Sequence, residues 1–168
     1  MELLVTTIIL LIILLGGDYL VKICVRNKSL VDVFIHGIIG LTIASPLISP
    51  YLLLLAFTIS TILDVDHFIA AKSMRISDAI TLKNRPCTHS LTFGVFISSV
   101  IWICTKNDKI AITVALAILS HVLRDAPSRK TLILWPAKFD SIPYWSYIVM
   151  EMLLLFICWI FANLSSLL

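Results

Sequence analysis

Leu63-Asp64-Val65-Asp66-His67-Phe68 closes a hydrophobic run that begins near Pro50. Charged groups at the end of a membrane-spanning helix are costly unless they are paired, metal-bound or wetted, so they indicate a functional site. On a helix, Asp64 and His67 stand three residues apart and share one face. Asp66 is turned by about 200° from Asp64 at helical pitch, so it joins the same site only if the helix ends there. The alternative is that Asp66 caps a helix and His67 lies among lipid headgroups.

The composition predicts an all-α, polytopic membrane protein with one domain, residues 1–168. Of these 168 residues, 60% are hydrophobic and 14% are charged, and the mean hydropathy is +1.03. A soluble domain carries about 25% charged residues. A span needs about 20 apolar residues, so we expect a bundle of about six transmembrane helices, at residues 3–23, 31–48, 51–70, 89–105, 110–123 and 144–164. The fourth and fifth are short enough to lie partly inside the bundle.

The loops predict the orientation of the chain in the membrane. The basic residues of three loops on one side are Lys22, Arg26, Lys28, Lys72, Arg75, Lys83, Arg85, Arg124, Arg129, Lys130 and Lys138, whereas the other side has only Lys106 and Lys109. Cytoplasmic loops collect Lys and Arg, so we expect both termini to face away from the cytosol. The net charge of +3 therefore reports topology. We expect membrane lipids as partners, and no nucleic acid.

With this topology, every histidine of the chain falls in one layer, at the cytosolic ends of the spans. His36 lies near the start of the second span, His67 ends the third, His89 begins the fourth and His121 ends the fifth. Four aspartates lie at the same level: Asp18, Asp64, Asp66 and Asp125. His121 and Asp125 stand four residues apart and therefore share a helical face.

Imidazole and carboxylate together are the ligands that suit zinc and other divalent transition metals. We therefore predict a divalent metal site, with zinc as the leading ion. Its candidate ligands are His36, Asp64, His67, His89, His121 and Asp125. This set exceeds what one tetrahedral ion needs, which indicates either two ions or one ion whose imidazoles are oriented by further carboxylates.

Asp66, Arg85 and Arg124 are the candidate catalytic residues. Asp66 would be a ligand or a general base. The two arginines lie close in sequence to His89 and His121, where a guanidinium suits a bidentate phosphate contact; the alternative is an anchor on anionic headgroups. Thr88 and Ser90 flank His89 and either orient it or cap the fourth span. Glu151, a lone acid within the sixth span, is a weaker site candidate than the residues of the histidine layer.

Four motifs carry a resemblance to known families: Asp-Val-Asp-His at 64–67, Arg-Pro-Cys-Thr-His-Ser at 85–90, Ser-His-Val-Leu-Arg-Asp at 120–125 and Leu-Trp-Pro at 134–136. They resemble the successive motifs of the bacterial YdjM family, multi-pass inner-membrane proteins classed as metal-dependent hydrolases with a distant likeness to zinc-dependent phospholipase C. The transmembrane protein 267 family of eukaryotes is more similar, and its likeness extends over residues 64–90 and 134–147. The sequence departs from the bacterial pattern after Asp125, at Ala126-Pro127-Ser128.

The residues and the resemblance together favour hydrolysis of a phosphoester, such as a phospholipid headgroup, at a metal site on the cytosolic side. The alternative is a non-catalytic protein: a metal-stabilised membrane scaffold, or a metal-binding or transport protein that uses the same layer. A transporter needs a polar path to the other face of the membrane. The outer halves of the first, third and sixth spans are apolar, which counts against transport.

Overall fold

The structure, a computed structural model, describes residues 2–24, 28–75, 86–127 and 141–165, and within these ranges all regular elements are helical. They are α1 (Glu2–Ile23), α2 (Lys28–Ala44), η1 (Ser45–Leu47), α3 (Pro50–Ile62), η2 (Leu63–Val65), α4 (Asp66–Ala71), α6 (Leu91–Thr105), α7 (Asp108–Asp125) and α8 (Tyr144–Leu164). Four stretches are long and apolar enough to cross a membrane: Leu3–Ile23, Lys28–Leu47, Pro50–Ala71 and Tyr144–Leu164. The predicted all-α polytopic membrane protein is confirmed.

The fourth and fifth predicted spans differ from these four. α6 is an apolar helix of 15 residues, which gives a length of roughly 22 Å, less than the hydrocarbon core of about 30 Å. α7 has 18 residues, carries charges at both ends and is buried along most of its length. α7 is therefore the helix that lies inside the bundle, whereas α6 packs on it and leaves apolar side chains such as Phe96 and Ile103 exposed.

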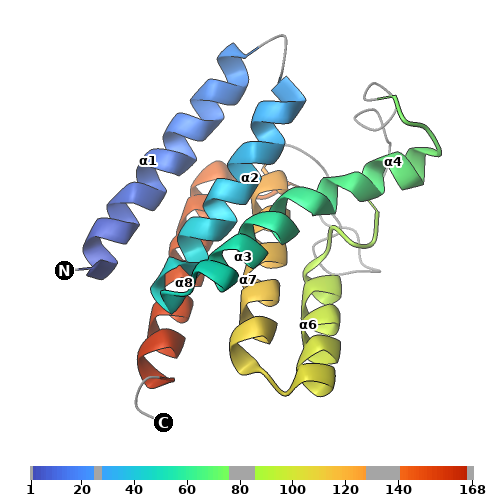
Figure 1. The fold of residues 1–168 in the computed structure, drawn as a ribbon. Coiled ribbons are helices and arrows are strands. Elements are labelled where there is room, and N and C mark those ends of the chain that lie inside the picture. The colour runs from blue at the N-terminus through green and yellow to red at the C-terminus, as the bar shows by residue number, and fades with distance from the viewer. Residues whose placement is uncertain (1, 25–27, 76–85, 128–140, 166–168) are drawn as a thin grey trace.

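α2 and α7 form the centre of the bundle. Each contacts the other, and both contact α3 and α8; α2 also contacts α1, and α7 also contacts α6. Figure 1 shows the two termini and the α6–α7 turn at one end of the bundle, with the C-terminal end of α1 and the N-terminal end of α2 at the opposite end. The buried side chains between these helices are apolar and include Leu10, Leu14, Ile39, Ile43, Leu116 and Leu155.

Two glycines of α2 allow α3 to approach closely. A Cβ atom on Gly40 would lie 2.1 Å from Oγ of Ser60, and one on Gly37 would lie 2.6 Å from side-chain carbons of Phe57 and Thr61. Small residues at such positions let two membrane helices pack backbone to backbone. The approach brings Ser60 of α3 against α7, where its hydroxyl donates to the carbonyl of Ala117 at 3.2 Å.

α3 ends where the acidic stretch begins. Its last residue is Ile62, Leu63–Val65 form a 3-10 turn, and α4 begins at Asp66. A 3-10 turn is more tightly wound than an α-helix, so the side chains of Asp64, Asp66 and His67 are not related by helical pitch alone. The condition under which Asp66 would join Asp64 and His67 is thus met.

Candidate metal centre

Four donor atoms from three segments converge at one end of the bundle, in a set that we call the His/Asp cluster: Asp64 from η2, His89 from the loop before α6, and His121 and Asp125 from α7. The two imidazole Nε2 atoms are 3.0 Å apart, and Oδ1 of Asp64 lies 3.7 Å from His89 and 3.5 Å from His121. Oδ2 of Asp125 lies 3.8 and 3.9 Å from the same two nitrogens. A tetrahedral ion with bonds of about 2.0–2.1 Å needs donors about 3.3 Å apart. The residues therefore fit a small divalent ion after slight contraction.

The hydrogen bonds of the two imidazoles fix which nitrogen faces the cluster. Nδ1 of His121 lies 2.7 Å from the carbonyl oxygen of Ser60, and Nδ1 of His89 lies 3.1 Å from Oδ2 of Asp66. Carbonyl and carboxylate oxygens only accept, so each Nδ1 carries a proton and, in the neutral ring, Nε2 presents a lone pair. Two lone pairs and two carboxylate oxygens then face one another in a buried place. This arrangement of acceptors is suited to a cation.

The electrostatics of His89 point the same way. This residue lies in the loop before α6, and its side chain is fully buried. Burial lowers the pKa of His89, but the nearby carboxylates of Asp64 and Asp66 outweigh burial, so the pKa lies above its ordinary value. The negative potential that favours a protonated imidazole equally favours a bound cation.

Asp66, His67 and His89 form a second group of converging donors. Oδ1 of Asp66 lies 2.9 Å from Nδ1 of His67, and Oδ2 accepts hydrogen bonds from Nδ1 of His89 and from the hydroxyl of Thr88. Because Nδ1 of His89 is hydrogen-bonded to Asp66, Nε2 is the nitrogen that faces the His/Asp cluster. Asp66 thus has the position of a carboxylate that orients a ligating imidazole, which favours one ion over two.

The other two histidines lie against the carboxylates of the cluster. Nδ1 of His67 is 3.8 Å from Oδ1 of Asp64, and Nε2 of His36 is 3.8 Å from Oδ1 of Asp125. Ring centroids are 4.0 Å apart for His36 and His121 and 4.4 Å apart for His67 and His89. All four predicted imidazoles therefore lie together. His121 and His89 are fully buried, whereas the Asp64 side chain is 24% exposed, so solvent reaches the cluster at Asp64.

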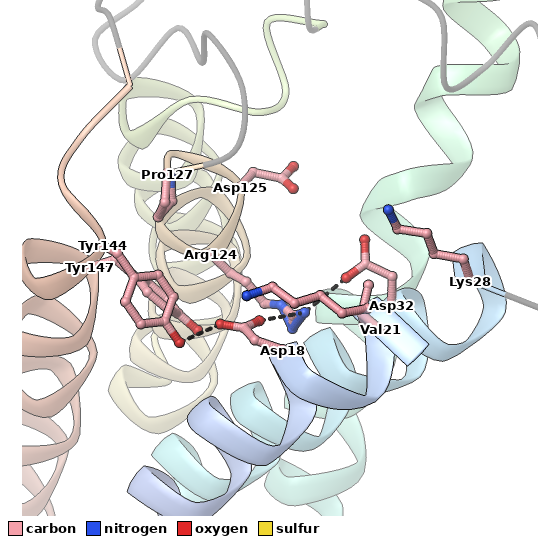
Figure 2. A pocket seen from close by; sticks show the side chains of 10 residues that line it. Asp18, Val21, Lys28, Asp32, Arg124, Asp125, Pro127, Tyr144 and Tyr147 are labelled. Carbon is pink, nitrogen blue, oxygen red and sulfur yellow. Dashed lines mark hydrogen bonds and ion pairs between the residues drawn. The ribbon is translucent and has the colours of Figure 1, made fainter. Parts of the chain in front are cut away.

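Arg124 turns away from the histidines into a separate set that we call the arginine cluster: Asp18, Asp32, Arg124 and Tyr144. Nη2 of Arg124 donates to Asp18 at 3.1 Å and to Asp32 at 2.9 Å, and the Tyr144 hydroxyl donates to Asp18 at 2.6 Å, as Figure 2 shows. Asp18, which the sequence placed in the histidine layer, belongs here. Arg85 lies outside the described residues.

Three residues of these clusters and their contacts were missed in the sequence: Asp32, Tyr144 and Ser60. Asp32 stands four residues before His36 and so shares its face of α2; this spacing, together with the need of a buried arginine for a carboxylate, was a usable signal. The carbonyl of Ser60 gives no signal in the sequence.

Of the two hydroxyls beside His89, Thr88 holds Asp66, and Ser90 caps α6 by accepting from the backbone N–H of Phe93. Glu151 lies apart, fully buried, with Ser120 donating to it at 3.4 Å.

Comparison with known proteins gives one relative. Transmembrane protein 267 of Danio rerio is 27% identical over 157 residues, which cover 83% of this chain and 69% of that protein. No family model matches the chain, and no solved structure matches it. The similarity supports the predicted resemblance to the transmembrane protein 267 family, and the relationship to the bacterial YdjM family stays a prediction. Along most of its length, this membrane protein is thus similar to transmembrane protein 267.

Proposed function

We propose that this chain is a membrane-embedded hydrolase that uses one divalent ion, with zinc as the first candidate, to cleave a phosphoester such as a lipid headgroup. The observation that carries the proposal is the convergence of four acceptor atoms in the His/Asp cluster. The cluster is closed on the protein side by His89 and His121 and reaches solvent at Asp64. A hydrolytic site needs both features.

Each residue of the site has a place in this chemistry. A bound ion would supply an activated water with a pKa near about 7 and would polarise the phosphoryl oxygen. His89, His121 and Asp125 would hold the ion from the buried side, and Asp64 would hold it from the solvent side, where substrate would arrive. Asp66 fixes His89 through Nδ1. Nδ1 of His67 faces the carboxylates of both Asp66 and Asp64. His67 and the closer Asp66 form an imidazole–carboxylate pair, an arrangement suited to moving a proton.

The interior of the bundle counts against transport. Beyond the histidine layer, the core between α1, α2, α7 and α8 is made of buried apolar side chains such as Leu10, Leu14, Ile39 and Leu155. Within the described part of the chain, Glu151 is the ionisable carboxyl buried among these helices, and it pairs with Ser120. The buried hydroxyls of Thr42, Ser98 and Thr113 donate to backbone carbonyls of their own helices. An ion that left the cluster inward would therefore meet a largely apolar interior.

The distribution of basic residues supports a cytosolic position for this site. The ends of α1, α4 and α7 and the starts of α2 and α8 all belong to the basic side of the predicted topology. Cytoplasmic loops collect Lys and Arg, so we propose that the His/Asp cluster opens toward the cytosol and that both termini lie on the opposite side. A site at this level meets the phosphate groups of the inner leaflet.

A structural role for the ion is the second candidate, and one observation favours it. Four protein donors are enough to fill a tetrahedral site completely, as in closed structural zinc sites. The donors come from η2, from the loop before α6 and from α7, so an ion would tie these segments together. In that case the protein is a metal-stabilised membrane scaffold.

Headgroup and phosphate release separates the two candidates. The full chain, purified in detergent, is incubated with phospholipids and lipid phosphates, with chelator and with metal added back, and its bound metal is measured in the same samples. The hydrolase predicts chelator-sensitive release by the wild type and by the control Ser120→Ala, and none by His121→Ala. A metal-loaded wild type that cleaves no substrate class supports the scaffold. A wild type that holds no metal excludes both.

A further inference from the structure

A cavity of about 490 Å³ lies beside the His/Asp cluster, between the ends of α1 and α7 and the starts of α2 and α8. Its lining includes Lys22, Lys28, Arg124, Tyr144 and Tyr147, together with Asp125. In Figure 2, Tyr144 and Tyr147 of α8 lie on one side of Arg124, and Asp32 and Lys28 of α2 lie on the other. Because Asp125 belongs both to the lining and to the His/Asp cluster, the cavity and the candidate metal site share a wall.

Arg124 uses only part of its hydrogen-bonding capacity. Its side chain is 5% exposed, and Nη2 serves both Asp18 and Asp32. Nε and Nη1 have no hydrogen-bond partner among the residues that the structure describes. Buried charged donors without acceptors are destabilising, and the planar fork of arginine is suited to phosphate oxygens. The guanidinium is therefore held in place on one side and lacks an acceptor on the other.

Tyr147 shows the same shortage. The residue is 1% exposed, and within the described chain its hydroxyl has no hydrogen-bond partner. Its neighbour Tyr144, one turn earlier on α8, donates to Asp18. Arg124 and Tyr147 both line the cavity. Their unsatisfied atoms lie just beneath its surface and are two guanidinium nitrogens and one phenol oxygen, all of them donors. Their common missing partner is an oxygen-rich acceptor.

The charges of the lining indicate that this acceptor is an anion. Asp18 and Asp32 are already paired with Arg124, and Asp125 faces His36, His89 and His121. The lining holds three cations (Lys22, Lys28 and Arg124) and three carboxylates (Asp18, Asp32 and Asp125), and each carboxylate already faces a partner within the described residues. Lys22 and Lys28 are exposed at the rim, where they can attract a diffusing or membrane-bound anion.

We propose that this cavity binds a phosphate group, with Arg124 and Tyr147 as the buried donors and Lys22 and Lys28 as the rim. The phosphate belongs either to a lipid headgroup or to free phosphate. As a substrate site the cavity rests on the proposed hydrolase, because it would present a phosphate beside Asp125. As a binding site it does not need the ion, and this difference makes the two proposals separable.

Binding to the full chain in maltoside micelles tests the inference. The probes are inorganic phosphate, dihexanoyl phosphatidic acid and dihexanoylglycerol, which is the same lipid without phosphate, each titrated with and without chelator. Arg124→Lys keeps the charge and removes the fork, and should weaken phosphatidic acid binding roughly 10- to 100-fold. Tyr147→Phe removes one hydroxyl and should weaken it about 3- to 10-fold. Lys106→Gln/Lys109→Gln at the other end of the bundle is the control for the exposed pair Lys22→Gln/Lys28→Gln.

The expected result is phosphate-dependent binding that survives chelation. Tyr147→Phe and Lys22→Gln/Lys28→Gln should weaken it, and the control should not. These two variants test the inference even if Arg124→Lys fails to fold. Tighter binding of phosphatidic acid than of inorganic phosphate identifies a lipid headgroup; equal affinities identify free phosphate. Equal binding of phosphatidic acid and dihexanoylglycerol, or equal affinity in all variants, overturns the inference. Phosphate binding that chelator abolishes also overturns it but leaves the hydrolase standing. Chelator-resistant binding without hydrolysis sustains the inference alone.

Discussion

The His/Asp cluster and the arginine cluster meet at two consecutive residues of α7, Asp125 and Arg124. The two clusters are suited to ligands of opposite charge. In the first, two imidazole lone pairs face two carboxylate oxygens, an arrangement suited to a cation. In the second, buried guanidinium nitrogens lack acceptors within the described residues, and the missing partner is an anion. Unsatisfied buried atoms therefore indicate the charge of a ligand as well as its place.

The two clusters also differ in burial. The side chains of His89 and His121 are fully buried, whereas those of Asp18 and Asp32 are 21% and 39% exposed. Electrostatic interactions are stronger where water is excluded. Substitutions in the His/Asp cluster should therefore have the larger effects, and substitutions at the exposed edge of the arginine cluster the smaller ones.

His121→Ala should break the first cluster and leave the second. It removes a buried donor together with its link to Ser60, so metal affinity should fall by more than the roughly 10- to 100-fold that loss of an outer partner costs. Elemental analysis of purified protein measures the loss. The chelator sensitivity of the thermal midpoint should vanish as well, because an ion that binds only the folded state stabilises it by mass action. Loss of phosphate binding in the same variant would mean that the two clusters are one site.

Gly40→Ala should damage the His/Asp cluster from a distance. The new Cβ would lie 2.1 Å from Oγ of Ser60, whose carbonyl holds His121, and overpacking of this kind costs about 1–3 kcal/mol. Gly16→Ala is the matched control, since a Cβ there meets nothing within 4 Å. Thermal unfolding compares the two. Equal stabilities would show that α2 and α3 do not need this close contact.

Asp66→Asn should weaken metal binding without removing a ligand. The amide cannot accept from both His67 and His89 as the carboxylate does, and loss of such an orienting partner costs about 10- to 100-fold in metal affinity. Competition against a metal indicator measures the change. An unaltered affinity combined with lost hydrolysis would instead return Asp66 to the role of general base.

Asp32→Asn should have the smallest effect, and its sign is informative. It removes a negative charge 2.9 Å from Nη2 of Arg124 that repels an incoming anion, so phosphate binding should become tighter, by about 2- to 5-fold for so exposed a carboxylate. Titration with inorganic phosphate decides the sign. Weaker binding would assign to Asp32 the task of holding Arg124 in place.

Much of the site could be predicted because histidine is scarce in this chain. Four histidines in a chain of this length reveal a shared layer once the spans are drawn, and the spacing of His121 and Asp125 follows from helical pitch. The 3-10 turn at Leu63–Val65 contains neither glycine nor proline, so the sequence offers no signal that predicts it. The pairing of Asp32 with Arg124 depends on how α2 and α7 are rotated about their axes, which packing decides and sequence spacing does not.

The stoichiometry of metal binding tests the account most directly. Metal-free wild-type protein in detergent is titrated with zinc, and bound metal is measured after removal of the excess. We expect one ion per chain, because Nδ1 of His89 is hydrogen-bonded to Asp66 and only one set of four donors remains. His121→Ala should lose this ion, and Ser120→Ala should keep it. Two ions per chain would contradict the single-site geometry, and no ion would contradict the metal centre altogether.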